Sequence, residues 1–137
     1  MRIAVMDGQG GGIGKNIIER IRQTLGSSLT ILALGTNALA TAAMLRAGAD
    51  EGASGENAVL YNAPKVDVIV GSVGIIAANA MLGELTPAMA RAVAESPARK
   101  ILIPLNRCNL YVVGTNQDSL SPCLDEMTEI LRAMLSA

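Results

Sequence analysis

The sequence predicts an α/β fold in which helices cover both faces of a mostly parallel sheet. The core material is aliphatic, because half of the 137 residues are hydrophobic while Phe and Trp are absent and there are only two Tyr. Short β-branched runs alternate with stretches of helical periodicity, and a glycine cluster directly follows the first run. Buried parallel strands need such continuous apolar runs. We therefore expect one Rossmann-like three-layer domain over residues 1–137, with about five to six strands.

The N-terminal half alternates strands with helices. Residues 2–7 predict a central strand that ends at the glycine cluster, and residues 29–35 predict a second strand. Between them lies a helix that ends at Gly26, with its apolar side chains on one face: Ile13, Ile17, Ile18, Ile21 and Leu25. Thr36 or Asn37 can cap the Ala-rich helix that follows and ends at Gly48. A polar loop over residues 49–58 and a short strand over residues 58–62 come next.

The C-terminal half continues the alternation. Residues 66–72 predict a buried strand, residues 75–82 an apolar helix, and Thr86-Pro87 opens a helix to about Ser96. Strands are expected over residues 100–105 and 110–114, and a last helix begins at Ser121-Pro122. The helix at 75–82 and the last helix have more apolar surface than a small monomer needs, which predicts a homo-oligomer. The alternative is that both helices are buried against the sheet.

The composition excludes several classes of function. The chain has no histidine, so Ser-His-Asp catalysis, Cys-His catalysis and His-ligated metal sites are ruled out, and no metal is expected. Its net charge is −1 and its basic residues are scattered, which disfavours nucleic acid and membrane surfaces as partners. An N-terminal strand without a preceding signal peptide, together with only two cysteines, favours the cytoplasm.

The glycine cluster predicts an anion-binding loop. Five of the seven residues from Gly8 to Gly14 are glycine, and a lysine follows. A loop between a parallel strand and a helix presents free N–H groups and the positive end of the helix dipole, and both favour a phosphate. The alternative is that the glycines only allow a tight turn. The candidate cofactor-binding residues are Gly8, Gln9, Gly10, Gly11, Gly12, Ile13, Gly14 and Lys15.

The glycine spacing distinguishes between known nucleotide motifs. The GxGxxG pattern fails from either Gly8 or Gly10, and GxxxxGK[ST] fails because positions 9 and 16 are Gln and Asn. The GxxxGxG spacing of short-chain dehydrogenases fits Gly8, Gly12 and Gly14. This spacing favours a dinucleotide, NAD or NADP, over a triphosphate, with another nucleotide or a flavin as the alternative.

Two further features of a dehydrogenase are missing. The end of the second strand has Thr36 and Asn37 in place of the usual acidic residue, although both could contact a ribose or 2′-phosphate as well as cap a helix. Tyr61 and Lys65 match YxxxK, but Pro64 lies between them, and proline disfavours the helix that this pair requires. We interpret that match as accidental, and the catalytic residues stay undefined.

A second polar cluster follows the predicted strand at 100–105. Asn106, Arg107, Cys108 and Asn109 would lie at the carboxyl edge of the sheet, with Arg107 as an anion partner, and they are the candidate substrate-binding residues. Turn formation and corner packing are the alternative roles. Three residues at the end of the 66–72 strand and just after it could also contact the base or ribose of a nucleotide: Gly71, Ser72 and Gly74.

Five blocks of the sequence together resemble a family of small bacterial proteins known as a domain of unknown function. The blocks are DGQGGGIGK, LALGTN, GASGENA, GELTPAMA and ILIPLNRCN, and they span nearly the whole chain. The resemblance implies a Rossmann-like domain and supplies no reaction, substrate or catalytic residue. The site residues named above therefore rest on their own chemistry.

These observations predict a protein that binds a nucleotide at the glycine loop. If it is an enzyme, an NAD(P)-dependent reductase is the leading class, because the cofactor would supply chemistry that the side chains lack. The alternative is a non-catalytic ligand-sensing or partner-binding module that acts as a homo-oligomer. The chain lacks the added domain that dehydrogenases usually use for their substrate.

Overall fold

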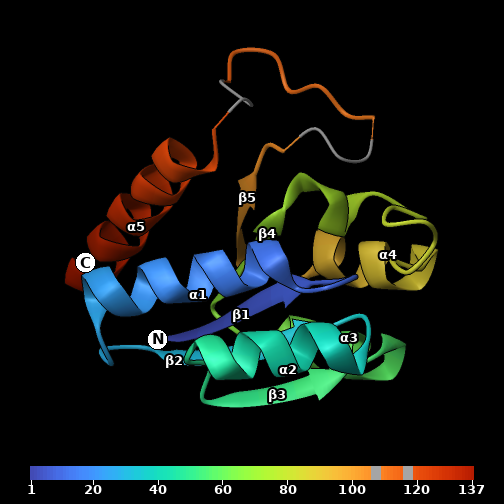
Figure 1. Ribbon diagram of the computed structural model, residues 1–137, viewed down its shortest axis with the longest axis horizontal. Helices are drawn as coiled ribbons and strands as arrows, with labels where there is room; N and C mark the ends of the chain where they lie inside the picture. Colours follow the sequence, from blue (N-terminus) through green and yellow to red (C-terminus); the bar gives the residue numbers. More distant parts are fainter. Residues whose placement is uncertain (106–108, 116–118) are drawn as a thin grey trace.

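The computed structural model describes residues 1–105, 109–115 and 119–137, and its five strands form one parallel sheet covered by helices (Figure 1). This confirms the predicted α/β class. The strands are β1 (Arg2–Asp7), β2 (Thr30–Gly35), β3 (Glu51–Ser54), β4 (Val68–Ser72) and β5 (Arg99–Ile103). The helices are α1 (Gly12–Leu25), α2 (Ala38–Ala47), α3 (Glu56–Asn62), α4 (Pro87–Glu95) and α5 (Leu120–Ser136), with two short 3-10 helices, η1 (Ala63–Lys65) and η2 (Val73–Ile76).

The strand order, β3-β2-β1-β4-β5, matches the first five strands of the Rossmann arrangement. Central β1 pairs with β2 through Val5 and Ala33, and with β4 through Val5 and Val70. The chain builds the β2 side of the sheet first and then crosses over to the β4 side. The carboxyl ends of β1 and β4 therefore flank the topological switch point, which is where open α/β sheets bind ligands.

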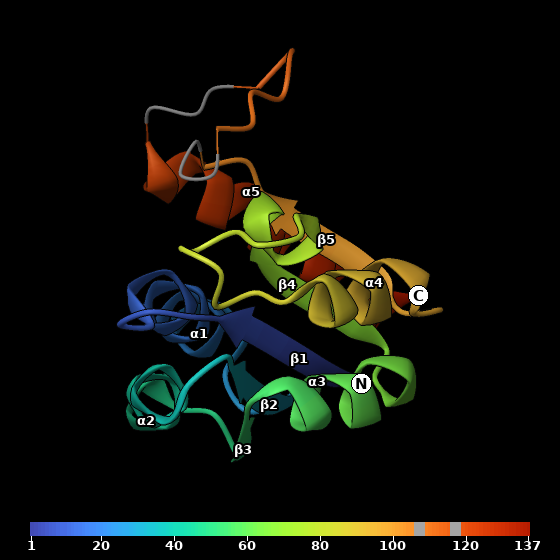
Figure 2. The same ribbon diagram turned by 90° about the vertical axis from the view of Figure 1, so that its right-hand side faces the viewer.

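Alternating side chains of each strand build two cores, one on each face of the sheet. Ile3 and Val5 of β1 pack with apolar residues of α1, α2 and α5, whereas Ala4 and Met6 pack with α3, α4 and the segment after η2. Figure 2 shows α1 and α2 on one side of the sheet and α3 and α4 on the other. Both faces of the strands are buried, which explains their continuous apolar sequences.

Local signals in the sequence set most helix boundaries. Asn37 caps α2, because its side-chain oxygen accepts a hydrogen bond of 2.8 Å from the Ala40 N–H, and Gly48 ends that helix. Thr86 accepts from the Met89 N–H at 3.1 Å and Pro87 occupies the first turn of α4. These caps confirm the predicted starts of α2 and α4.

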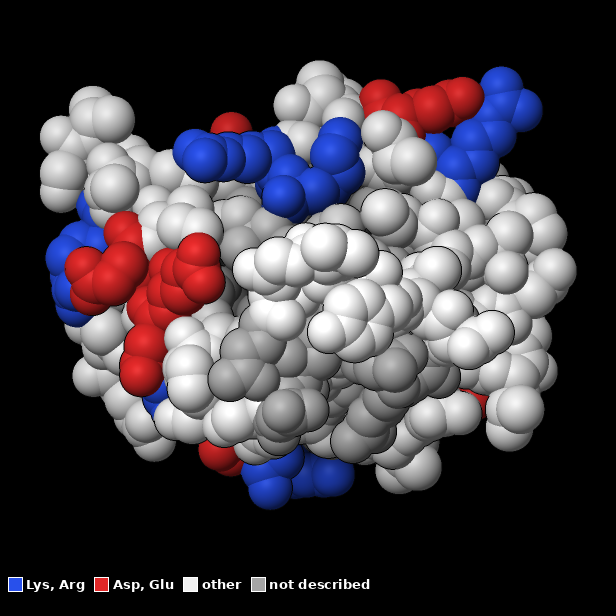
Figure 3. All heavy atoms as spheres, turned by 90° about the horizontal axis from the view of Figure 1, so that it is seen from above, with Lys and Arg blue, Asp and Glu red and all other residues white. Residues whose placement is uncertain are grey.

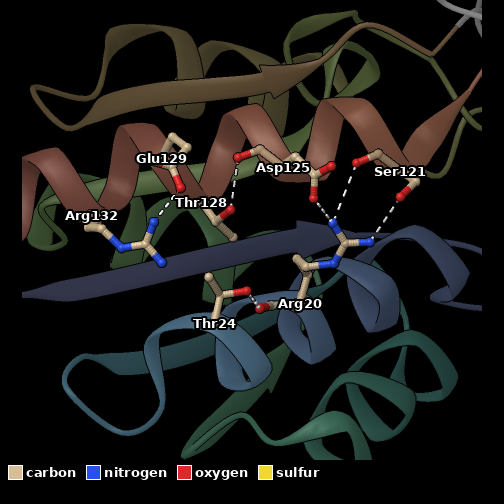
Figure 4. Close-up of polar contacts among 7 residues, drawn as sticks. All are labelled: Arg20, Thr24, Ser121, Asp125, Thr128, Glu129 and Arg132. Atoms are coloured by element: carbon tan, nitrogen blue, oxygen red, sulfur yellow. Dashed lines mark hydrogen bonds and ion pairs between the residues drawn. The ribbon is translucent and has the colours of Figure 1, made fainter.

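Helix α5 is held against α1 by polar contacts around Arg20 (Figure 4). The Arg20 guanidinium pairs with the Asp125 carboxylate and donates to the Ser121 hydroxyl at 3.1 Å. Beneath these contacts Leu124, Met127 and Leu131 are buried in the core that α5 shares with α1. The last helix therefore buries one apolar face inside this chain. This agrees with the alternative given above, in which the helix is buried against the sheet.

The helix predicted over residues 75–82 is wrong. Only η2 (Val73–Ile76) is helical there, and the chain then forms a compact loop, residues 77–85, before α4. Asn79, Met81 and Leu82 have φ values of 66°, 60° and 58°, which no right-handed helix contains. The apolar run was misleading because part of it serves tertiary packing: Ile75 and Ala80 are buried in the core that α3 and α4 cover, and Met81 packs against that core.

Three further predictions fail in the weaker parts of the sheet. The polar loop expected over residues 49–58 contains β3 and the start of α3, and the strand expected over residues 58–62 is part of α3. Strand β3 forms at the sheet edge where Asp50 accepts hydrogen bonds of 2.7 Å from the Ile31 N–H and 2.8 Å from Arg22. The strand expected over residues 110–114 is absent from the described part of the chain.

Among the residues that the structure describes, no helix combines the length and apolar character needed to cross a membrane.

Candidate functional site

A cavity opens at the switch point, at the sheet edge that faces the viewer in Figure 2. Its volume is about 170 Å³. The glycine loop forms its floor, the end of β4 forms one wall, and the 77–85 loop and the residue after Pro104 complete it. The lining residues are Asp7, Gly8, Gln9, Gly10, Gly11, Gly12, Ile13, Ser72, Gly74, Ala80, Met81, Leu82 and Leu105.

Asp7, the last residue of β1, organises the glycine loop. Its side chain is buried, and its two carboxylate oxygens accept hydrogen bonds of 2.8 Å from the Gly8 N–H and 2.7 Å from the Gly14 N–H. The carboxylate thus satisfies one of the N–H groups that the first turn of α1 leaves without a helical partner. It also fixes the distance between the end of β1 and the start of α1.

Three other N–H groups of the loop belong to residues that line the cavity and have no acceptor among the described residues. Gly11 donates to the Gly8 carbonyl at 2.9 Å, and Lys15 donates to the Gly11 carbonyl at 2.9 Å. Within the described ranges no acceptor is found for the N–H groups of Gly10, Gly12 and Ile13. All three residues line the cavity at the positive end of the α1 dipole. This arrangement can bind an anion through the backbone alone.

Four of the five glycines, Gly8 and Gly10 to Gly12, divide into two roles. A Cβ on Gly11 would lie 2.9 Å from backbone atoms of Ala40, and the residue has a φ of 75°, so the fold itself requires glycine there. A Cβ on Gly8 would lie 2.5 Å from the Thr36 hydroxyl, which is also an impossible contact. A Cβ on Gly10 or Gly12 would meet nothing within 4 Å, and neither residue has a positive φ. Turn formation therefore does not explain these last two glycines.

Ser72 forms the wall opposite the glycine loop. It ends β4, is 7% exposed, and accepts a hydrogen bond of 3.3 Å from the Gly74 N–H. Within residues 1–105, 109–115 and 119–137 its hydroxyl proton has no acceptor. A buried hydroxyl normally donates a hydrogen bond. The cavity therefore contains one more donor directed at the same space as the loop N–H groups.

Glu84 ties the 77–85 loop to the glycine loop and to the end of β2. A single carboxylate oxygen, Oε1, accepts hydrogen bonds from the Gln9 N–H at 2.8 Å, the Thr36 hydroxyl at 2.7 Å and the Asn37 amide at 2.8 Å. Asn37 also donates to the Gln9 carbonyl at 3.0 Å. Gln9 has a φ of 51°, and these bonds hold it in that unfavourable conformation.

The environment of Glu84 favours its charged form. The Gln9 N–H, followed by the Thr36 hydroxyl and the Asn37 amide, stabilises the carboxylate and keeps the pKa of Glu84 below its ordinary value, although partial desolvation opposes the shift. Glu84 is not among the residues that the sequence predicts for the site. No local pattern could have found it, because Glu84 is an isolated carboxylate in a loop and meets its partners only through the tertiary fold.

The family model described as domain of unknown function DUF3842 matches residues 2–136. The chain belongs to this family. That confirms the resemblance seen in the five sequence blocks. No curated protein matches this DUF3842 chain. Among solved structures it is similar to a dodecameric FMN-dependent UbiX-like decarboxylase from Escherichia coli O157:H7, at 15% identity and a TM-score of 0.48, with 96% of this chain and 75% of that chain covered.

The residues expected to contact a sugar in this DUF3842 chain lie outside the cavity. Thr36 and Asn37 follow β2, and both side chains donate hydrogen bonds to Glu84. The Asn37 side chain also caps α2. Lys15 lies within 4.0 Å of Glu19 on the surface of α1 and does not line the cavity. The described cavity lining contains no basic side chain.

The remaining predicted site residues divide into four groups. Ser72 and Gly74 line the cavity, whereas Gly71 is required by packing, because its Cβ would lie 2.7 Å from the Met6 carbonyl oxygen. Asn106, Arg107 and Cys108 lie outside the described residues. Asn109 is exposed, with a φ of 57°, and does not line the cavity.

The Tyr61–Lys65 pair lies at the opposite edge of the sheet. Lys65 stacks over the Tyr61 ring at 3.1 Å from its centroid and lowers the pKa of the tyrosine hydroxyl by a hydrogen bond and by its charge. Two residues later Asp67 bonds to the backbone of Arg2, at the amino end of β1. The pair is therefore remote from the cavity, which agrees with the interpretation of YxxxK as accidental.

Proposed function

We propose that this chain binds a nucleotide phosphate at the glycine loop, through the N–H groups of Gly10, Gly12 and Ile13 and the hydroxyl of Ser72. The observation that carries the proposal is the open space above Gly10 and Gly12. Packing and backbone conformation account for Gly8 and Gly11. At positions 10 and 12 the remaining physical reason for glycine is a ligand that approaches the backbone closely. The switch-point location of the cavity supports the same conclusion.

The chemistry available to the described cavity lining is limited. Asp7 is the one titratable side chain among the residues that line it, and both of its oxygens accept hydrogen bonds from backbone N–H groups. An enzyme built on this site would take its chemistry from the bound cofactor. The glycine spacing by itself favours NAD or NADP, but the cavity is lined from only one side of the switch point, which favours a flavin or another mononucleotide as that cofactor. Because both Asp7 oxygens already accept these hydrogen bonds, the site also supports a second candidate, a non-catalytic ligand-sensing module.

We also propose that the chain forms a homo-oligomer. The segment 109–115, at the top of Figure 1, exposes apolar side chains, with Tyr111 72% and Val113 87% exposed. Seen from above in Figure 3, acidic and basic side chains gather along the margins of the molecule, and the described surface in the middle carries neither. An exposed apolar surface of this kind is typical of an interface.

Thermal melting of the full chain with AMP, FMN, NAD, NADP, FAD and ATP tests the proposed function. A ligand that binds the folded state raises the melting temperature, and the rise grows with the logarithm of the ligand concentration once this exceeds the dissociation constant. We expect at least one of these compounds to do so, and we expect Gly12→Ala to abolish the rise while melting normally itself. No rise with any compound at millimolar concentration would contradict nucleotide binding. A screen for turnover with the bound compound then separates enzyme from sensor.

A further inference from the structure

We propose that the ligand of the glycine loop is a mononucleotide whose base lies on the β4–β5 side of the switch point, and that the β2 side is closed to a second nucleotide. This inference rests on the proposed function and narrows its ligand class. It follows from the one-sided lining of the cavity, the bonds of Glu84 and the apolar side chains beyond the glycine loop.

The cavity draws its lining from one side of the switch point. Its residues belong to the glycine loop, the end of β4 with the turn after it, the 77–85 loop, and Leu105 after β5. No residue of β2, β3 or α2 lines it. Dinucleotides bind across the switch point and place the adenosine ribose at the end of the second strand. The half of the crevice that would hold that ribose is therefore not part of this cavity.

The 77–85 loop occupies the β2 side. Glu84 takes the side-chain donors that follow β2, the Thr36 hydroxyl at 2.7 Å and the Asn37 amide at 2.8 Å. The Met81 sulfur lies 2.6 Å from the position of a Cβ on Gly8, so the loop packs directly on the start of the glycine turn. A ribose could enter only by breaking these bonds and displacing the loop.

Backbone hydrogen bonds hold the loop in this position. Asn79 donates to the Leu85 carbonyl at 2.8 Å, Leu85 donates back to the Ala80 carbonyl at 3.1 Å, and Gly83 donates to the Asn79 carbonyl at 3.1 Å. Between these bonds Met81 and Leu82 keep the left-handed conformation that most residues avoid. The loop is thus a fixed wall between the cavity and the end of β2.

The space between the 77–85 loop and Leu105, which follows β5, suits the base of one nucleotide. Its apolar lining comes from Ala80, Met81, Leu82 and Leu105, and Leu82 is 98% exposed at the rim. Such side chains pack against the face of a planar ring, while Ser72 and the loop N–H groups hold the phosphate.

Calorimetric titration of the full chain with matched compounds tests this inference: AMP against NAD, FMN against FAD, and inorganic phosphate. We expect a mononucleotide to bind at least about tenfold more tightly than the dinucleotide that contains it. Two Leu→Trp variants locate the base. Leu105→Trp fills the β5 side and should remove the preference for the mononucleotide over phosphate, whereas Leu39→Trp, on the exposed surface of α2, should leave its affinity unchanged.

Different results overturn the two proposals. Equal or tighter binding of NAD or FAD, or a loss of affinity in Leu39→Trp with none in Leu105→Trp, would overturn the mononucleotide inference and leave nucleotide binding intact. If no phosphate-bearing compound binds the folded chain, nucleotide binding itself fails, and the inference fails with it. Melting curves of both variants confirm that each titrated protein is folded.

Discussion

The carboxylate of Glu84 accepts a hydrogen bond of 2.8 Å from the backbone N–H of Gln9, a residue 75 positions earlier in the chain. The same oxygen holds the Thr36 hydroxyl and the Asn37 amide. One side chain therefore connects the loop after β4, the glycine loop after β1 and the end of β2. The shape of the candidate site depends on this connection, and the first prediction tests it.

Replacing Glu84 with Gln should destabilise the protein by about 1–2 kcal/mol at pH 7, because the hydrogen bonds lose their charged acceptor. The folded-state pKa of Glu84 is lowered, so its stabilisation is complete above the unfolded pKa of about 4.3 and is lost as the pH falls through the folded value. The deficit of the variant should therefore shrink below about pH 4. Urea unfolding across this range measures it.

Glu95→Gln is the matched control for that experiment. Glu95 pairs with Arg91 on the exposed surface of α4, and such pairs contribute little. A Glu84→Gln deficit that stays constant from pH 7 to about pH 3, or one no larger than that of Glu95→Gln, would contradict the role given to the carboxylate.

Two neighbouring glycines should respond oppositely to alanine. Gly11→Ala forces a left-handed alanine against the backbone of Ala40 and should cost at least about 1–2 kcal/mol of unfolding free energy. Gly12→Ala meets open space in the first turn of α1 and should leave stability unchanged or raise it by about 0.5–1 kcal/mol. Urea unfolding of both variants provides the comparison. A Gly12→Ala protein as unstable as Gly11→Ala would remove the argument that Gly12 is kept for a ligand.

Ser72→Ala should weaken binding of the nucleotide identified by melting by about tenfold or more, because a hydrogen bond to a charged group is lost. Calorimetry measures the affinity. Ser28→Ala, at an exposed hydroxyl that donates to the Leu25 carbonyl outside the cavity, is the control. Unchanged affinity in the Ser72 variant would show that its hydroxyl does not contact the phosphate.

Val113→Glu should reduce self-association. A charge on this exposed apolar side chain opposes the burial that an interface requires. Light scattering over a range of protein concentrations measures the mass, and Gln23→Glu on the exposed surface of α1 is the control. A wild-type chain that stays monomeric at every concentration would refute the homo-oligomer.

The fold could be predicted where local signals and burial agree. The apolar spacing from Ile13 to Leu25, the cap at Asn37 and the Thr86-Pro87 start all mark elements of the structure. The helix predicted over residues 75–82 failed because hydrogen bonds within the 77–85 loop hold Met81 and Leu82 in left-handed conformations. Strand β3 was missed because its sequence, EGAS, is polar and pairs only at the sheet edge.

The candidate site was predictable as a location but not in its detail. The glycine loop at the end of the first strand indicated an anion site, and the cavity lies there. Some of these glycines are required by packing and others face open space. Packing requires them where a Cβ would meet Thr36, Ala40 or Met81, and these residues are distant in sequence. Likewise, the hydrogen bonds from Thr36 and Asn37 to Glu84 form only when the 77–85 loop folds over the end of β2.

The most direct test of nucleotide binding is an ¹⁵N–¹H NMR titration of the full chain with the nucleotide that melting identifies. The N–H signals of Gly10, Gly12 and Ile13 should shift together and saturate. The Gly14 N–H, already bonded to Asp7, and the Gly26 N–H at the far end of α1 should shift much less. Saturable shifts confined to another part of the chain, or no shift of the loop signals at millimolar ligand, would contradict the account.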